Sequence, residues 1–100
     1  MAQYAIAFDM DTAAMKADGM SDSQVTSVYQ TEVPKALATA GFTEHAQGSV
    51  YHTQDVDSLV PIVGLQAILE KEAPSFCKYA KAVHVFRMEG WSEITALLKP

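Results

Sequence analysis

The order of hydrophobic patterns along this 100-residue chain restricts its fold more than any other feature. The segment QYAIAFDM, residues 3–10, alternates large and small apolar side chains, which is the period of a β-strand with two different faces. Residues 23–40 instead place apolar side chains three and four positions apart, which is typical of an amphipathic helix. Two short strands follow within residues 42–53, then a second helix that runs to about Glu72, and a last strand over residues 80–88.

This order, strand–helix–strand–strand–helix–strand, is the split βαβ pattern of ferredoxin-like α+β domains. We therefore predict one domain over residues 1–100, with a four-stranded antiparallel sheet, two helices on one face and a short C-terminal helical tail. Apolar residues make up 49% of the chain, which suffices for one core but leaves the second face of the sheet uncovered. A homodimer that buries this second face is the expected solution.

A few residues mark where the predicted elements end or bend. Gly41 is expected to stop the first helix, and Pro34 is expected to kink it or to divide it in two, because an interior proline costs about 3 kcal/mol. Residues 16–22 are turn-rich, and the two short strands are expected to meet near residues 47–48, with one bent strand as the alternative. Pro74 is expected to end the second helix. The candidate N-caps of that helix are Asp55, Asp57 and Ser58.

The overall charge and composition exclude several classes of protein. A net charge of −5 argues against a broad electrostatic grip on nucleic acid, although Lys78, Lys81 and Arg87 lie close together in the sequence. The single cysteine, Cys77, excludes an intramolecular disulfide. No apolar run approaches the ~20 residues that a membrane-spanning helix needs, and the N-terminus lacks the basic start of a signal peptide. We expect a soluble, cytoplasmic domain without membrane contact.

The first predicted strand ends in two carboxylates, Asp9 and Asp11. Asp9 follows Ala5 and Ala7 on the small-residue face, so it is either the polar end of a strand or part of a site. Asp11 is better explained as a turn residue or a helix N-cap. The stretch AFDMDTA also resembles the first motif of haloacid-dehalogenase-like phosphatases, but the acidic pair that this fold needs after a later strand is missing from the sequence.

Three stretches, YAIAFDMDT, GFTEHAQGSVY and AVHVFRME, resemble the virulence-associated protein D (VapD) family in order and spacing, over nearly the whole chain. The resemblance implies a small ferredoxin-like homodimer, related in fold to the small CRISPR-associated nucleases of the adaptation machinery. It also implies endoribonuclease activity on RNA and, as for some members, the role of a toxin that is paired with a small antitoxin protein.

The same resemblance assigns individual residues. The first-strand aspartate of the family falls on Asp9, and the serine of its Gly-Ser-Val-Tyr strand falls on Ser49. The last strand departs from the family, because Ala82 stands where members often have an aspartate, and His84 where they have an arginine. This departure implies either a weakened activity or a transfer of part of the chemistry to His84.

RNA cleavage needs a base, a donor for the leaving oxygen and positive charge near the phosphate. Asp9 could serve as the base or hold a magnesium ion, which is the single cofactor that the sequence leaves open. His84 is the candidate acid, because imidazole titrates closest to neutral pH, and Ser49 could donate to a phosphate oxygen. His45 and His52 lack a convincing spacing for a metal site.

Lys81, Arg87 and Tyr51 are the candidate RNA contacts. The two basic residues could instead protect an edge strand from aggregation. Tyr51, like Tyr4 and Tyr29, could belong to the core or an interface rather than stack on a base. A second class of function therefore stays open: a dimeric, non-enzymatic protein that binds nucleic acid or an antitoxin-like partner. Cleavage of a labelled RNA, with and without EDTA, separates the two classes.

Overall fold

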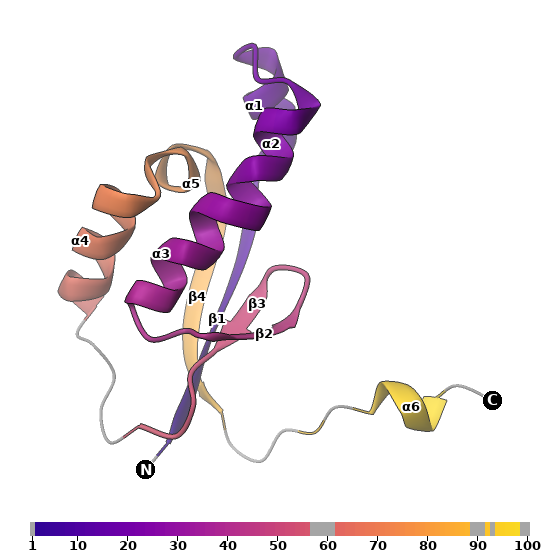
Figure 1. Cartoon of the computed structure of the whole chain (residues 1–100), viewed down its shortest axis with the longest axis vertical. Coiled ribbons are helices and arrows are strands. Elements are labelled where there is room, and N and C mark those ends of the chain that lie inside the picture. Colours follow the sequence, from indigo (N-terminus) through magenta and orange to yellow (C-terminus); the bar gives the residue numbers. More distant parts are fainter. Residues whose placement is uncertain (1, 57–61, 89–91, 93, 99–100) are drawn as a thin grey trace.

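A computed structural model describes residues 2–56, 62–88, 92 and 94–98, and its path is shown in Figure 1. The strands are β1 (Gln3–Met10), β2 (Glu44–Gln47), β3 (Val50–His52) and β4 (Ala80–Met88). The helical segments are α1 (Thr12–Ala17), α2 (Asp22–Ser27), η1 (Val28–Glu32), α3 (Val33–Thr39), α4 (Ile62–Glu72), α5 (Pro74–Tyr79) and α6 (Thr95–Leu98).

The four strands form one antiparallel sheet in the order β2-β3-β1-β4. In each half of the chain the two strands joined through helices are separated by one other strand. Thus β3 lies between β1 and β2, and β1 lies between β3 and β4. This separation is what the term split βαβ describes, so the predicted ferredoxin-like α+β fold is confirmed.

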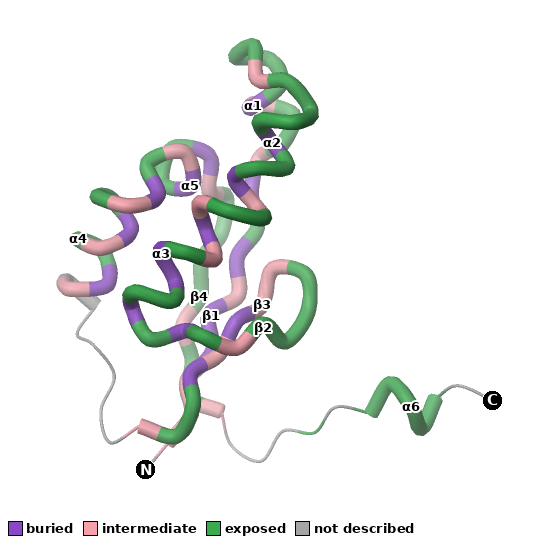
Figure 2. The backbone as a smooth tube through the Cα atoms, in the orientation of Figure 1, coloured by how far each residue is buried: buried purple, intermediate pink, exposed green. Residues whose placement is uncertain are grey.

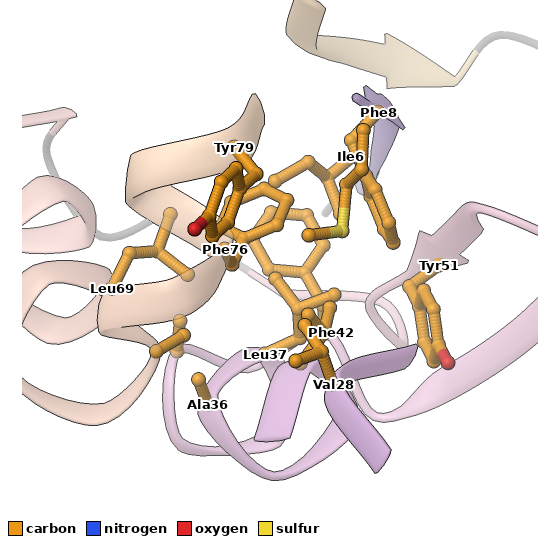
Figure 3. Close-up of a cluster of buried hydrophobic side chains, with 14 of the residues drawn as sticks. Ile6, Phe8, Val28, Ala36, Leu37, Phe42, Tyr51, Leu69, Phe76 and Tyr79 are labelled. Atoms are coloured by element: carbon orange, nitrogen blue, oxygen red, sulfur yellow. The ribbon is translucent and has the colours of Figure 1, made fainter. Parts of the chain in front are cut away.

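One face of the sheet packs against the helices and contains the core (Figure 3). From the central strand β1, Ile6, Phe8 and Met10 are all buried, as the period-two pattern predicts. They meet apolar side chains from the helices and from β3, and Figure 2 shows these buried positions along β1 and on the inner sides of α3 and α5. The helix-derived members include Val28, Val33, Leu37, Leu65, Leu69 and Phe76.

The other face of the sheet carries the alternate residues of the same strands. Ala5, Ala7 and Asp9 lie on this open face of β1, and the register of β4 adds Ala82, His84 and Phe86. Phe86 is 49% exposed, whereas Ala5 is only 1% exposed, because it lies between Phe86 and the β3 residue His52 in the ladder. Within the described residues, only the C-terminal segment with Ser92, Ile94 and Thr95 borders this face.

The predicted helix over residues 23–40 is divided as expected, into α2 and α3. Between them lies the π-helical turn η1, in which the Val33 N–H bonds to the Val28 carbonyl, five residues earlier. Pro34 follows at once and has no N–H to donate, so the regular bonding pattern is interrupted where the sequence predicted. Gly41 ends the helix with a φ of 101°, and the Phe42 N–H bonds back to the Leu37 carbonyl at 2.8 Å.

Two short helices were not predicted. The expected turn over residues 16–22 is wrong for Lys16 and Ala17, which belong to α1, because the Asp11 side chain caps this helix by accepting from the Ala14 N–H at 2.9 Å. Pro74 ends α4 as expected, but it also begins α5, since proline suits the first turn of a helix. Neither helix is long enough to show a clear periodicity.

The remaining boundaries agree with the prediction where they are described. The hairpin β2–β3 turns at Gly48 and Ser49. The prediction of two short strands is therefore confirmed, and the alternative of one bent strand is wrong. The C-terminal helical tail is α6. The candidate caps Asp57 and Ser58 lie outside the described residues, as do the residues directly before Ile62.

Candidate active site

Asp9 lies near the C-terminal end of β1, on the open face of the sheet, and its side chain is exposed. Its partner on β4 is Ala82, whereas the next residue, Met10, pairs with Ala80. Lys81 is therefore an extra residue of β4, a β-bulge beside Asp9. Bulges of this kind redirect a side chain and are common next to active sites. The bulge brings a lysine next to the candidate carboxylate in the strand ladder.

Ser49 reaches the same end of β1 from the other side. Pairing between β1 and β3 ends at Ala7 and Val50, and the Phe8 N–H then bonds to the Ser49 carbonyl at 3.1 Å. This bond fixes the hairpin turn to the residue that precedes Asp9. Ser49 is half-buried there, at the rim of the sheet.

His84 lies on the same face as Asp9, one pair further along the β1–β4 ladder, opposite Ala7. It is exposed. Diagonal neighbours on one face of an antiparallel pair have backbones roughly 7 Å apart, a separation that suits two side chains that contact the same phosphodiester. The structure thus brings Asp9, Lys81, Ser49 and His84 to one end of the sheet.

The other two predicted RNA contacts lie elsewhere. Arg87 is exposed but pairs with Tyr4, at the far end of β1 from Asp9. Tyr51 is 7% exposed and belongs to the core, where its ring stacks on the exposed His45 ring with centroids 4.3 Å apart. Burial raises the pKa of the Tyr51 phenol. An RNA nucleobase that approaches Tyr51 from the solvent would therefore contact the His45 ring before the Tyr51 ring.

His45 is held in place by two contacts. Besides stacking on Tyr51, its Nε2–H donates to the Gly48 carbonyl at 2.8 Å. Because a carbonyl oxygen only accepts, this hydrogen bond places a proton on Nε2. In His52 the other ring nitrogen is the donor, because its Nδ1–H donates to the Thr53 carbonyl at 2.8 Å. The contacts that are described for these two histidines are therefore structural.

Tyr29 of η1, for which the sequence left open a core, interface or base-stacking position, packs against the core, and its ring is half-buried there. Burial, and then the negative charge of Asp9, raise the pKa of its phenol. The amphipathic spacing of the helix had favoured this core position.

The structure offers limited support for a metal ion. Among the residues that the structure describes, no group of three His, Cys, Asp or Glu side chains is arranged to hold one. Asp11 is occupied as a helix cap, so Asp9 is the carboxylate left at this end of β1. Magnesium is often held by one or two carboxylates together with substrate phosphates and water. Asp9 could supply the single carboxylate ligand of such a site, and the other ligands would be water and the phosphate of the substrate.

In the described part of the chain, no helix is both long enough and apolar enough to cross a membrane.

Comparison with known proteins gives one consistent family. No protein-family model matches the chain. Three curated proteins match it: an endoribonuclease VapD homolog of Helicobacter pylori at 30% identity, the endoribonuclease VapD of Dichelobacter nodosus at 33%, and an endoribonuclease VapD homolog of Neisseria gonorrhoeae at 32%. Each alignment covers 96% of this chain, and 96%, 97% and 98% of the respective relatives. The chain therefore belongs to the VapD family.

Proposed function

We propose that this protein is an endoribonuclease whose active site is centred on Asp9. The observation that supports this function most is the exposed carboxylate at the end of a buried strand, next to the bulged Lys81. Within the described residues, no hydrogen bond or ion pair engages the Asp9 side chain, so nothing in the fold requires a carboxylate there. The names of the three curated relatives agree with this chemistry.

In the proposed reaction Asp9 takes the proton of the ribose 2′-hydroxyl, and the oxygen attacks the adjacent phosphorus. The bond to the 5′-oxygen breaks, and this oxygen takes a proton from His84 on the same sheet face. Lys81 and Ser49 stabilise the negative charge on the phosphate oxygens. If magnesium is bound, Asp9 supplies its protein ligand and the ion adds positive charge at the phosphate.

The open face of the sheet is the proposed surface for a homodimer. It carries the half-exposed Phe86 and the small residues Ala5 and Ala7, so that a second sheet can approach closely. Dimerisation through this face would place two copies of Asp9 at the rim of one interface. Cellular RNA as the substrate would place the action of the dimer in the cytoplasm.

A second candidate function is the binding of a partner, such as an antitoxin protein, with or without cleavage of RNA. It is favoured by a groove of about 450 Å³ between α4, α5 and the edge strand β4. Its apolar lining includes Leu65, Leu69, Phe76, Val83 and Val85. An extended segment of a partner could pair with the edge of β4 and insert side chains there. In that arrangement the protein would be the toxin of a toxin–antitoxin pair.

The decisive experiment is cleavage of a labelled, mixed-sequence RNA by the purified protein, with and without EDTA. Asp9→Asn keeps the shape of the side chain and removes the base, so we expect a loss of roughly 100-fold or more. Asp11→Asn is the matched control, because asparagine also caps helices, and it should keep most of the activity. Ser49→Ala should fall between the two. A parent protein that cleaves no better than a mock purification would exclude the enzyme and leave the binding function.

A further inference from the structure

Helix α6, residues Thr95–Leu98, buries none of its side chains in its own chain. Figure 1 shows it apart from the sheet and from the other helices. Its Leu97 N–H bonds locally, to the Ile94 carbonyl at 2.9 Å. Isolated helices shorter than about 12 residues are only marginally stable in water, so a helix of four residues depends on packing against another surface.

The side chains of α6 are apolar and open to water. Leu97 and Leu98 are 82% and 73% exposed, more than the other exposed large apolar residues that the structure describes. Helix α6 has the sequence TALL and carries no charge that would favour contact with water. Neighbouring large apolar side chains that stay exposed mark an interaction surface. The two leucines therefore indicate a contact that a single chain does not make.

A hollow of about 400 Å³ lies on the open face of the sheet, next to this tail. Its apolar lining residues are Ala5, Ala46, Val50, Phe86, Met88 and Ile94. Polar side chains complete the lining, and the small size of the two alanines gives the hollow its depth. An engineered cavity of about 150 Å³ holds a benzene molecule, so this hollow has room for two side chains of the size of leucine.

Within one chain the leucines do not fill this hollow. Ser92, Ile94 and Thr95 line it, whereas Leu97 and Leu98 do not. The tail therefore begins at the rim of the open face, and its most apolar part lies beyond that rim. When two such faces meet about a two-fold axis, a segment at the rim of one lies against the other, and each contact occurs twice. One chain thus supplies both the hollow and the apolar segment that matches it.

We propose that two copies of this chain exchange their C-terminal tails, and that Leu97 and Leu98 of each copy insert into the hollow of the other. This exchange rests on the dimer through the open face that is proposed above, and it names the segment that completes the interface. The hollow contains Ala5, four residues before Asp9 on β1, or roughly 13 Å along the strand. The exchanged tails therefore leave the candidate active site uncovered.

The first test truncates both leucines, with Leu97→Ala and Leu98→Ala in one chain. Alanine is a good helix former, so this double variant removes the apolar side chains and keeps the helix. Burial of each leucine contributes roughly a factor of ten or more to affinity, so the dissociation constant of the dimer should rise at least ~100-fold. Val83→Ala is the matched control, because Val83 is exposed on the other face of β4, and its dimer should be unchanged. Sedimentation over a range of concentrations measures all three proteins, after thermal melts have shown that they are folded.

Disulfide cross-linking shows which chain the tail contacts. One chain carries Leu97→Cys, a second, longer chain with an affinity tag carries Ala46→Cys, and both carry Cys77→Ser so that no other thiol is present. After mixing and mild oxidation we expect a covalent dimer that contains one chain of each length. A tagged chain with Val83→Cys in place of Ala46→Cys should give none. A chain with both Leu97→Cys and Ala46→Cys that instead closes a disulfide within itself would overturn the exchange, because its tail then folds back on its own face.

The outcomes separate the exchange from the dimer on which it rests. If the parent is a monomer, both are overturned. If the parent is a dimer that Phe86→Asp dissociates, and the double alanine variant keeps the parent's dissociation constant, the exchange alone is wrong. Masses and cross-links are measured without RNA, so a failure of the proposed cleavage reaction leaves this test unaffected.

Discussion

Asp9 of β1 and Ala82 of β4 are directly opposed in the antiparallel ladder, and their side chains share the open face of the sheet. Opposed side chains of such a pair have Cβ atoms roughly 5 Å apart. The position at which the VapD resemblance implies an aspartate is therefore the position that faces Asp9. A carboxylate there would complete an acidic pair across two strands, next to the bulged Lys81.

Restoring that carboxylate should strengthen a magnesium-dependent reaction. Ala82 is exposed, so Ala82→Asp is tolerated by the fold and gives two carboxylates at magnesium-binding distance from a common point. We expect faster RNA cleavage in magnesium, by about tenfold or more, and loss of this gain in EDTA. Ala82→Asn is the control, since it has the same shape without the charge. Equal rates for both variants and the parent would show that the position takes no part in the reaction.

Phe86 tests the proposed dimer interface. Phe86→Asp places a charge in the middle of the open face, where burial against a second sheet would be strongly unfavourable. The parent should sediment at micromolar concentration with twice the mass of the 10.9 kDa chain, and the variant at the mass of one chain. Val83→Asp is the control, because Val83 is also exposed on β4 but points to the other side. A monomeric parent would contradict the dimer.

Pro34 tests the account of the divided helix. It lies in the first turn of α3, where proline is favourable, and its removal also makes the unfolded chain more flexible. We therefore expect Pro34→Ala to be modestly destabilising, by up to about 1 kcal/mol. Pro74→Ala should behave in the same way, because Pro74 is at the first turn of α5. Thermal melts detect such changes as shifts of about 4–8 °C, and an increase of that size for Pro34→Ala would contradict our explanation.

Tyr79 predicts how stability depends on alkaline pH. Its hydroxyl donates to Asp18 Oδ2 at 2.7 Å, and this bond, followed by burial, raises the pKa of the phenol above the value of the unfolded chain. The folded state therefore holds this proton more tightly. The stabilisation is present below pH ~10 and is lost as the pH rises through the raised pKa. Tyr79→Phe should be less stable than the parent at pH 8, and this difference should become smaller as the pH rises above ~10. Denaturant unfolding over a series of pH values measures this, and a constant difference would refute it.

The sequence determined the sheet and the faces of its strands. The alternation in QYAIAFDM placed Ile6 and Phe8 in the core and Asp9 opposite them, because successive side chains of a strand must point to opposite sides. The residue types alone also predicted that Asp11 caps a helix and that Gly41 ends one. These features depend on neighbours within a few residues, so they can be predicted from sequence.

The composition of the candidate site was decided only by the tertiary structure. The bulge at Lys81 and the pairing of Asp9 with Ala82 join residues far apart in the chain. Tyr51 was a candidate RNA contact because of the motif in which it lies. In the structure its ring is buried by residues from other strands and from the helices, which the motif alone does not reveal. Strand register and helix phase are fixed by long-range packing, and a period in the sequence specifies a face but not the partner that it meets.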